Sequence, residues 1–256
     1  GHDDALAQFS REIAAGTLAH GIILAGPKGI GKATLAYHLA HQLLGKTTDI
    51  AHRIATGAHS DVLVVEQEFD PKKEELSREI SVEQARRIGE FLALTPGEGD
   101  WRVVIVDSAD ALNVNGANAI LKILEEPPPQ AILLLVSHHP GRLLPTIRSR
   151  CRMVALKPLA QEAFIEAMRR LAPEAEALEL SALRQLSGGS PGAALALKEQ
   201  EALALYAQLL ELLAAPGRDP LTLHSFTEQA LANDRIHERW QLCLRLMLFA
   251  LERAAK

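Results

Sequence analysis

One short segment constrains the fold of this chain more than any other. The apolar run GIILA leads directly into the glycine-rich segment GPKGIGK, and residues 34–44 then have the periodicity of an amphipathic helix. A strand, a glycine-rich turn and a helix in this order are typical of a phosphate-binding loop, because backbone N–H groups and the helix N-terminus create a positive field. Gly26, Gly29 and Gly31 are therefore predicted to wrap a phosphate, and Lys32 to reach the outer phosphates of a nucleotide.

The segment departs from the usual phosphate loop at one position. The pattern calls for a hydroxyl directly after the lysine, where it would ligate magnesium, and this chain has Ala33 there. Thr34 is the nearest hydroxyl and is kept as a candidate nucleotide-binding residue. It lies about 100° further around the helix, so it cannot take over the magnesium position.

A second departure follows the strand WRVVIVD. Asp107 ends this strand, where an acid can hold magnesium in phosphate-loop enzymes. In phosphate-loop proteins that hydrolyse ATP, a glutamate often follows this aspartate and polarises the attacking water. Here the next residue is Ser108, which is a poor base. Asp110 is near in sequence, but it is expected to lie on the following turn and to point elsewhere. A plain strand-end cap remains the alternative role for Asp107.

Near-continuous apolar strands alternate with helical segments over the first part of the chain, which indicates an α/β fold with a parallel sheet covered on both faces. Five strands are expected, with the three arginines of TIRSRCRMVAL in the loop and strand at the end. After Pro158 the sequence becomes rich in Ala, Leu and Glu, as expected for helices. The predicted domains are the phosphate-loop core, a small helical domain and the start of a helical C-terminal domain, at residues 1–157, 158–203 and 204–256.

Composition narrows the class of protein. Apolar residues make up 48% of the 256 residues and the formal net charge is −5, which describes a globular protein and argues against one that coats nucleic acid electrostatically. With two distant cysteines, Cys151 and Cys243, a disulfide framework is not expected. The longest apolar run is too short for a membrane span, and a cytoplasmic location is predicted.

Four segments together resemble one family. GPKGIGKATLA, RVVIVDSADALNVNGANAILKILEEPPP, LLLVSHHPGRLLPTIRSRC and GGSPGAAL, in this order, are similar to the delta-prime family of bacterial DNA polymerase III clamp-loader subunits, which are AAA+ proteins. The resemblance covers roughly residues 1–200. It implies an AAA+ core, a helical lid and a C-terminal collar, of which residues 204–256 would be only the beginning.

The resemblance also implies roles for individual residues. Ser137 and His138 fall where the first sensor lies, and Ser149, Arg150 and Cys151 match the Ser-Arg-Cys motif. In that family the arginine, here Arg150, enters the ATP site of the neighbouring subunit and acts in trans. Without the resemblance, the alternating arginines at 148, 150 and 152 describe a solvated strand face.

Two further departures concern the lid and a metal. Gly192 stands where ATPase members of the family carry a second-sensor arginine. Many delta-prime relatives have a four-cysteine zinc module between the phosphate loop and the second strand, and this chain has no cysteine there. His52 and His59 are interpreted as surface histidines, and no zinc is predicted.

The expected function is that of a stator in the clamp loader of the DNA polymerase III holoenzyme. It would bind ATP or ADP with Mg²⁺ weakly or not at all, hydrolyse little ATP itself, and assemble with the tau/gamma and delta subunits to load the sliding clamp on primed DNA. The alternative is an active AAA+ ATPase of the tau/gamma or branch-migration type, since Lys32 and Asp107 are intact. A nucleotide kinase ranks below both, and no polymerase active site is expected.

Overall fold

The computed structural model describes residues 1–45, 47–70, 75–214, 224 and 236–255. The chain divides into two compact units, one comprising His2–Pro158 and the other Leu159–Lys256 together with Gly1.

The first unit is built around a five-stranded sheet. Its strands are β1 (Gly21–Ala25), β2 (Val62–Glu66), β5 (Arg102–Asp107), β6 (Ala131–Ser137) and β7 (Arg152–Ala155). They lie in the order β2-β5-β6-β1-β7, and every neighbouring pair is parallel. The carboxyl ends of β1, β2, β5 and β6 therefore meet at one edge of the sheet, which is where a parallel α/β fold places its ligands.

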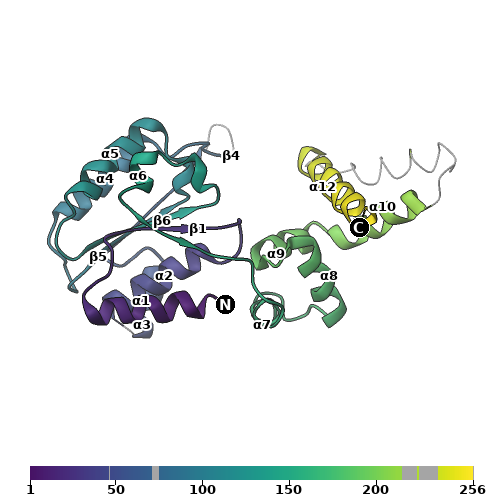
Figure 1. The fold of residues 1–256 in the computed structure, drawn as a ribbon, viewed down its shortest axis with the longest axis horizontal. Coiled ribbons are helices and arrows are strands. Elements are labelled where there is room, and N and C mark those ends of the chain that lie inside the picture. The colour runs from purple at the N-terminus through teal and green to yellow at the C-terminus, as the bar shows by residue number, and fades with distance from the viewer. Residues whose placement is uncertain (46, 71–74, 215–223, 225–235, 256) are drawn as a thin grey trace. The chain divides into compact units, whose positions relative to one another are not determined.

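Helices cover both faces of this sheet (Figure 1). One face carries α1 (Asp3–Ala15), α2 (Lys32–Leu44) and α3 (Thr48–Ala55), and the other carries α4 (Val82–Ala93), α5 (Val114–Glu125) and α6 (Pro145–Arg148). The short 3-10 turns η1 (Ala109–Ala111) and η2 (Pro140–Arg142) follow β5 and β6. The predicted parallel sheet with helices on both faces is confirmed.

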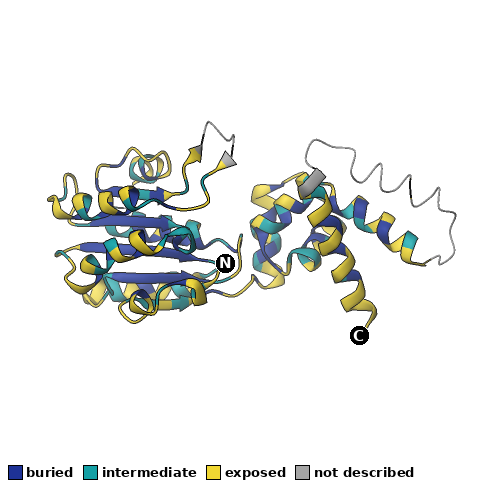
Figure 2. Cartoon of the chain, turned by 90° about the horizontal axis from the view of Figure 1, so that it is seen from above, coloured by how far each residue is buried: buried dark blue, intermediate teal, exposed yellow. Residues whose placement is uncertain are grey.

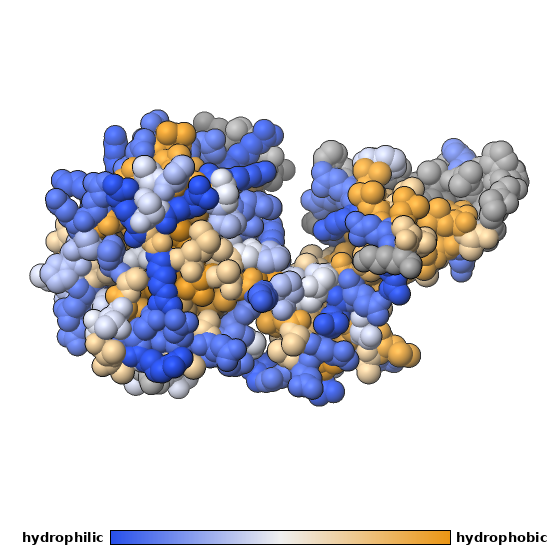
Figure 3. Space-filling model, viewed as in Figure 1, coloured by the Kyte–Doolittle hydropathy of each residue, from blue (hydrophilic) through white to orange (hydrophobic). Residues whose placement is uncertain are grey.

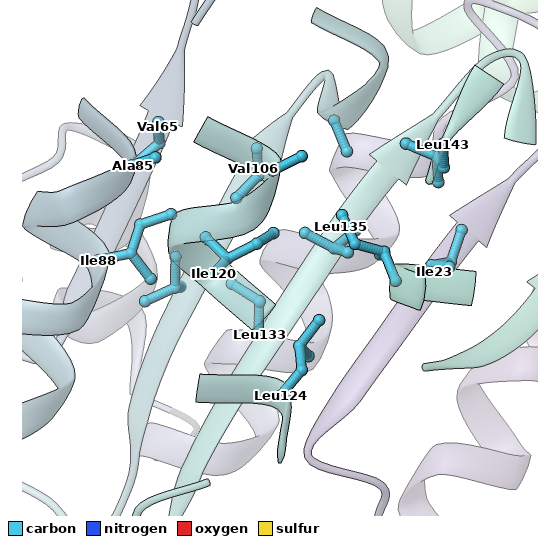
Figure 4. Packing of buried hydrophobic residues seen from close by; sticks show 14 of the residues in the cluster. Ile23, Val65, Ala85, Ile88, Val106, Ile120, Leu124, Leu133, Leu135 and Leu143 are labelled. Carbon is cyan, nitrogen blue, oxygen red and sulfur yellow. The ribbon is translucent and has the colours of Figure 1, made fainter. Parts of the chain in front are cut away.

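Each face of the sheet has its own hydrophobic cluster, and the central strands β1, β5 and β6 between them are almost fully buried (Figure 2). In the cluster under α4 and α5, Ile88 and Ile120 pack toward Leu133 and Leu135 of the central strand β6 (Figure 4). All seven residues of β6 are buried. Burial on both faces explains why the sequence of this strand is continuously apolar rather than alternating.

Local signals set most helix ends. The first helix spans residues 3–15, and α4 begins at a capping box, in which the side chains of Ser81 and Gln84 each accept a hydrogen bond from the other's backbone N–H. The three prolines after Glu126 end α5, because a proline cannot supply the next helical N–H.

Helix α3 and the short strands β3 and β4 were not predicted. Helix α3 fills the segment after α2, where the side chain of Thr47 accepts a hydrogen bond from the Ile50 N–H and so caps the helix. The charged segment after β2 contains the antiparallel strands β3 (Phe69–Asp70) and β4 (Glu75–Leu76). Residues 71–74, which connect these strands in sequence, lie outside the described residues.

The second unit is helical. It contains α7 (Gln161–Leu171), α8 (Ala177–Ser187), α9 (Pro191–Glu199), α10 (Ala202–Ala214) and α12 (Ile236–Ala254), which share one hydrophobic cluster. Hydrophobic side chains remain exposed over α10 and α12 (Figure 3), among them Leu213, Trp240 and Leu248. The predicted boundary between residues 203 and 204 stays a prediction, and much of 204–256 lies outside the described residues. Within the part of the chain that is described, no helix has the length and apolar character needed to cross a bilayer.

Candidate functional site

The glycine-rich loop joins β1 to α2 and has the backbone of a phosphate-binding loop. Gly26, Gly29 and Gly31 have φ values of 154°, 81° and 98°, in the region that favours glycine. A Cβ atom added at Gly26 would lie 2.5 Å from the carbonyl oxygen of Leu156, and the Gly26 N–H donates to the Ser137 carbonyl at 3.2 Å. The loop is thus packed into the sheet edge as well as shaped for a phosphate.

Lys32 begins α2 and turns back over this loop. Its ammonium group donates to the carbonyl oxygens of Gly26 at 2.7 Å and of Pro27 at 2.6 Å. Burial lowers the pKa of Lys32 to about 8, although the nearby carboxyl groups of Asp107 and Asp110 oppose that change. The lysine lies in the predicted place, with its charge directed at carbonyl groups of its own loop.

Asp107 ends β5 beside this lysine, as predicted. Burial and the carboxylate of Glu66 raise the pKa of Asp107, whereas Lys32 works in the opposite direction. Glu66 ends β2 and is the register partner of Asp107 on the adjacent strand. Burial, Glu66 and Asp107 also raise the pKa of Tyr37 on α2. Burial and neighbouring carboxylates therefore outweigh the charge of Lys32 at this corner of the edge.

Glu66 and Tyr37 were missed in the sequence analysis. Glu66 could have been found by the rule that identified Asp107, since both are acids at the carboxyl ends of apolar strands. Tyr37 could not, because its approach to both carboxyl groups depends on how α2 packs over the sheet.

Asp110 lies on the turn after β5, as expected, and its carboxylate ties η1 to the end of β6. Its carboxylate accepts hydrogen bonds from the Ser137 hydroxyl at 2.7 Å, from the His138 N–H, and from the His139 N–H at 3.2 Å. Burial and the charge of Lys32 lower the pKa of His138, which favours its neutral imidazole. The predicted first-sensor residues thus lie at the same edge as Lys32, with Ser137 already bonded within the chain.

The groups at this site can bind a phosphate, but they lack several side chains that hydrolysis of magnesium ATP uses. The loop offers glycine backbone, a helix N-terminus and Lys32. Ala33 brings only a methyl group to the usual magnesium position, and the Thr34 side chain is exposed. Ser108, directly after Asp107, has no carboxylate. Gly192, in the first turn of α9 in the second unit, has no side chain.

The three alternating arginines do not share a strand face, so that alternative is wrong. Arg148 is the last residue of α6, Arg150 lies in the turn that follows, and only Arg152 belongs to β7. Arg152 pairs with Glu12 of α1 and lies over the ring of Phe9. Proline at the first position of α6 starts a short helix where strand periodicity suggested extended chain.

Arg150 is held at an exposed corner of the first unit. Its Nη2 lies 2.7 Å from Oε1 of Glu125, and its Nη1 donates to the carbonyl oxygen of Thr146 at 3.1 Å. The side chain of Arg150 is 35% exposed and that of Glu125 is 49% exposed. Glu125 belongs to the LEEPP segment, so the two motifs quoted for the resemblance meet in space. We name this group, comprising Glu125, Thr146 and Arg150, the arginine corner.

Apolar contacts lie beneath the arginine corner. A Cβ atom added at Gly21 would lie 2.8 Å from Leu124 Cδ2 and 3.0 Å from Cys151 Sγ, so both motifs pack against the same glycine. Burial raises the pKa of Cys151 to about 11. The residues adjoining Glu125 and Arg150 in sequence therefore fix the backbone of the corner.

One histidine differs from its prediction. His52 is exposed, whereas His59 is buried, and its Nδ1 accepts a hydrogen bond from the Asp61 N–H at 3.1 Å. The interpretation of His59 as a surface residue is wrong, because its ring caps the turn that leads into β2. No group of three or more potential metal-binding His, Cys, Asp or Glu side chains converges among the residues that the structure describes.

Comparisons with known proteins agree with these motifs. A family model described as DNA polymerase III, delta subunit, matches residues 1–160. DNA polymerase III subunit delta' of Pseudomonas aeruginosa is 41% identical over 202 residues, covering 75% of this chain and 60% of the relative. The subunit delta' of Escherichia coli is 32% identical over 230 residues, covering 85% of this chain and 66% of the relative.

A solved structure supports the fold. The crystal structure of a DNA polymerase III gamma subunit-related protein from Thermotoga maritima matches with a TM-score of 0.50 at 23% identity, covering 93% of this chain and 75% of that one. At this identity the match shows the fold alone, and it supports the predicted α/β fold followed by helices. This chain spans 60% and 66% of the lengths of the two curated relatives described above. By its sequence match, the chain belongs to the family of DNA polymerase III delta-prime subunits.

Proposed function

We propose that this chain is a clamp-loader subunit that supplies Arg150 to the ATP site of a neighbouring subunit and hydrolyses little or no ATP itself. Its partners would be the tau/gamma and delta subunits, and the complex would load the sliding clamp on primed DNA. The chain would act in the cytoplasm, with weak or no binding of ATP or ADP with Mg²⁺ and without zinc.

One observation carries this proposal. Arg150 stands exposed at a corner that its own chain holds in place, and none of the bonds that hold it involves the glycine loop. An arginine brought in from outside stabilises negative charge that develops on a transferring phosphoryl group, with rate effects of about 10³–10⁵ in other phosphate-loop enzymes. An arginine that acts in trans must be both accessible and held in place, and Arg150 is both.

The glycine loop supports the second half of the proposal. Ala33 and Ser108 each lack a group that hydrolysis of magnesium ATP uses, and Gly192 brings no arginine from the lid. The loop can still receive a phosphate group through its N–H groups and Lys32.

The test compares two variants of the full-length subunit in the reassembled complex. With DNA and clamp present, Arg150→Ala should abolish most of the ATP turnover at the adjoining site, by a factor of about 10³, while Lys32→Ala should leave turnover close to wild type. Arg148→Ala is the matched control, since it removes an exposed arginine from the same segment.

The reverse pattern would reject the proposal. If Lys32→Ala is the damaging change and Arg150→Ala is silent, this loop hydrolyses ATP and the chain is an active AAA+ ATPase. Magnesium-dependent turnover by the isolated subunit, abolished by Lys32→Ala, would lead to the same conclusion.

A further inference from the structure

We propose that Glu125 is a positioning residue for Arg150, so that the LEEPP segment serves the trans-acting arginine of its own subunit. This inference rests on the proposed function and adds to it a residue that acts through Arg150. It comes from one contact, the 2.7 Å approach of Glu125 Oε1 to Arg150 Nη2.

The contacts of Arg150 fix the plane of its guanidinium group. Glu125 lies against Nη2, while Nη1 donates to the Thr146 carbonyl at 3.1 Å and to the Ser149 hydroxyl at 3.5 Å. Partners on two nitrogens restrain rotation of the group about its long and flexible side chain. A guanidinium has five N–H groups in a fixed fork, so N–H groups remain for an anion outside the chain.

The anchor points of this arrangement are themselves rigid. Glu125 is the last residue of α5, and its neighbour Leu124 is buried in the core cluster. The carbonyl oxygen of Leu124 is also bonded to the ring of His20 at 3.1 Å. On the other side, Thr146 belongs to α6, whose Ile147 is buried in the same cluster. A carboxylate held on one packed helix and a carbonyl on another therefore define where the arginine lies.

The solvent exposure of Glu125 and Arg150 determines how strongly Glu125 can affect the position of the arginine. Because both side chains are partly exposed, water and salt screen the pair, and such pairs change an equilibrium by about twofold to fivefold. Glu125 thus tunes Arg150 without replacing it. An arginine without this carboxylate would still reach the neighbouring site, but it would spend less time in the productive orientation.

The experiment uses the complete complex with DNA and clamp, and measures the Arg150-dependent part of ATP turnover, defined as wild type minus Arg150→Ala. Glu125→Gln should lower that part about twofold to fivefold, with the KM for ATP unchanged, because Glu125 does not hold the nucleotide. Glu126→Gln, the adjacent exposed glutamate in the same segment, is the matched control and should have no effect. The double variant Glu125→Gln/Arg150→Ala should turn over ATP at the same rate as Arg150→Ala.

Each contrary result has a distinct meaning. If Arg150→Ala has no effect, the proposed function fails and no Arg150-dependent part exists to measure. If Arg150→Ala is damaging but Glu125→Gln equals wild type, or raises turnover, Glu125 does not position the arginine and the inference is overturned. If the double variant falls clearly below Arg150→Ala, Glu125 acts by another route, which also overturns it.

Discussion

The glycine loop has the backbone of a binding site without the reactive side chains, whereas the arginine corner has the side chain on an ordinary backbone. At the loop the backbone has the form of a phosphate site, with positive φ values at Gly26, Gly29 and Gly31, but Ala33 and Ser108 lack the reactive side-chain groups. At the corner the backbone is an ordinary helix end and turn, but the arginine is present, exposed and held. Backbone form and side-chain chemistry are therefore separable, and a phosphate loop alone does not establish an ATPase.

The loop backbone has a structural reason to exist without any nucleotide. The Gly26 N–H bonds to the end of β6, and its missing side chain admits the carbonyl of Leu156. Changing this glycine should therefore damage the fold, whatever the loop binds.

The largest loss of stability is expected from two glycine substitutions, Gly26→Ala in the glycine loop and Gly21→Ala beneath the arginine corner. Gly26→Ala should lower the free energy of unfolding by about 3 kcal/mol or more, because the new Cβ would meet backbone 2.5 Å away. Gly21→Ala should cost about 1–3 kcal/mol, since the atoms it meets, in Leu124 and Cys151, are side-chain atoms that can shift. Urea denaturation would measure both.

Gly16→Ala provides the control for these variants. Gly16 also has a positive φ, of 67°, but no atom lies within 4 Å of an added Cβ. It should cost only about 1 kcal/mol. A loss at Gly26 no greater than at Gly16 would mean that the loop backbone is not packed as described, and would remove the structural explanation for its form.

A smaller effect is expected from Asp110→Asn. The carboxylate of Asp110 accepts three hydrogen bonds from the end of β6, and an amide must turn an N–H toward at least one of those donors. The free energy of unfolding should fall by about 2 kcal/mol, measured by thermal or urea denaturation at pH 7. An unchanged stability would show that this carboxylate does not tie η1 to β6.

The smallest effect, with the opposite sign, is expected from Asp107→Asn. The raised pKa of Asp107 means that the folded state favours the protonated carboxyl. The group therefore stabilises the fold at low pH. This stabilisation is lost as the pH rises through the folded-state pKa. Asp107→Asn should therefore stabilise the protein at pH 7, by less than about 1 kcal/mol because water screens a half-exposed group. Near pH 3.5 the gain should vanish. Destabilisation at pH 7 would indicate that Asp107 is paired there rather than crowded.

Sequence reasoning predicted the elements of the core well where the signal was local. The capping box of α4, the prolines after α5 and the apolar strands each identify an element from neighbouring residues alone. It failed where a contact joins distant segments. Arginines 148, 150 and 152 alternate as on a strand, yet α6 forms because Ile147 packs into a core assembled from elsewhere. The pairing of Glu125 with Arg150 likewise spans 25 positions, from residue 125 to residue 150, and no local pattern marks it.

The sulfur of Cys151 gives the arginine corner a chemical property of its own. Alkylating agents and peroxides attack the thiolate, and a thiol whose pKa is about 11 has about one molecule in ten thousand ionised at pH 7. The Cys151 thiol therefore remains protonated and unreactive beneath Arg150. Oxidative conditions that disable enzymes with activated cysteines should leave the geometry of this corner intact.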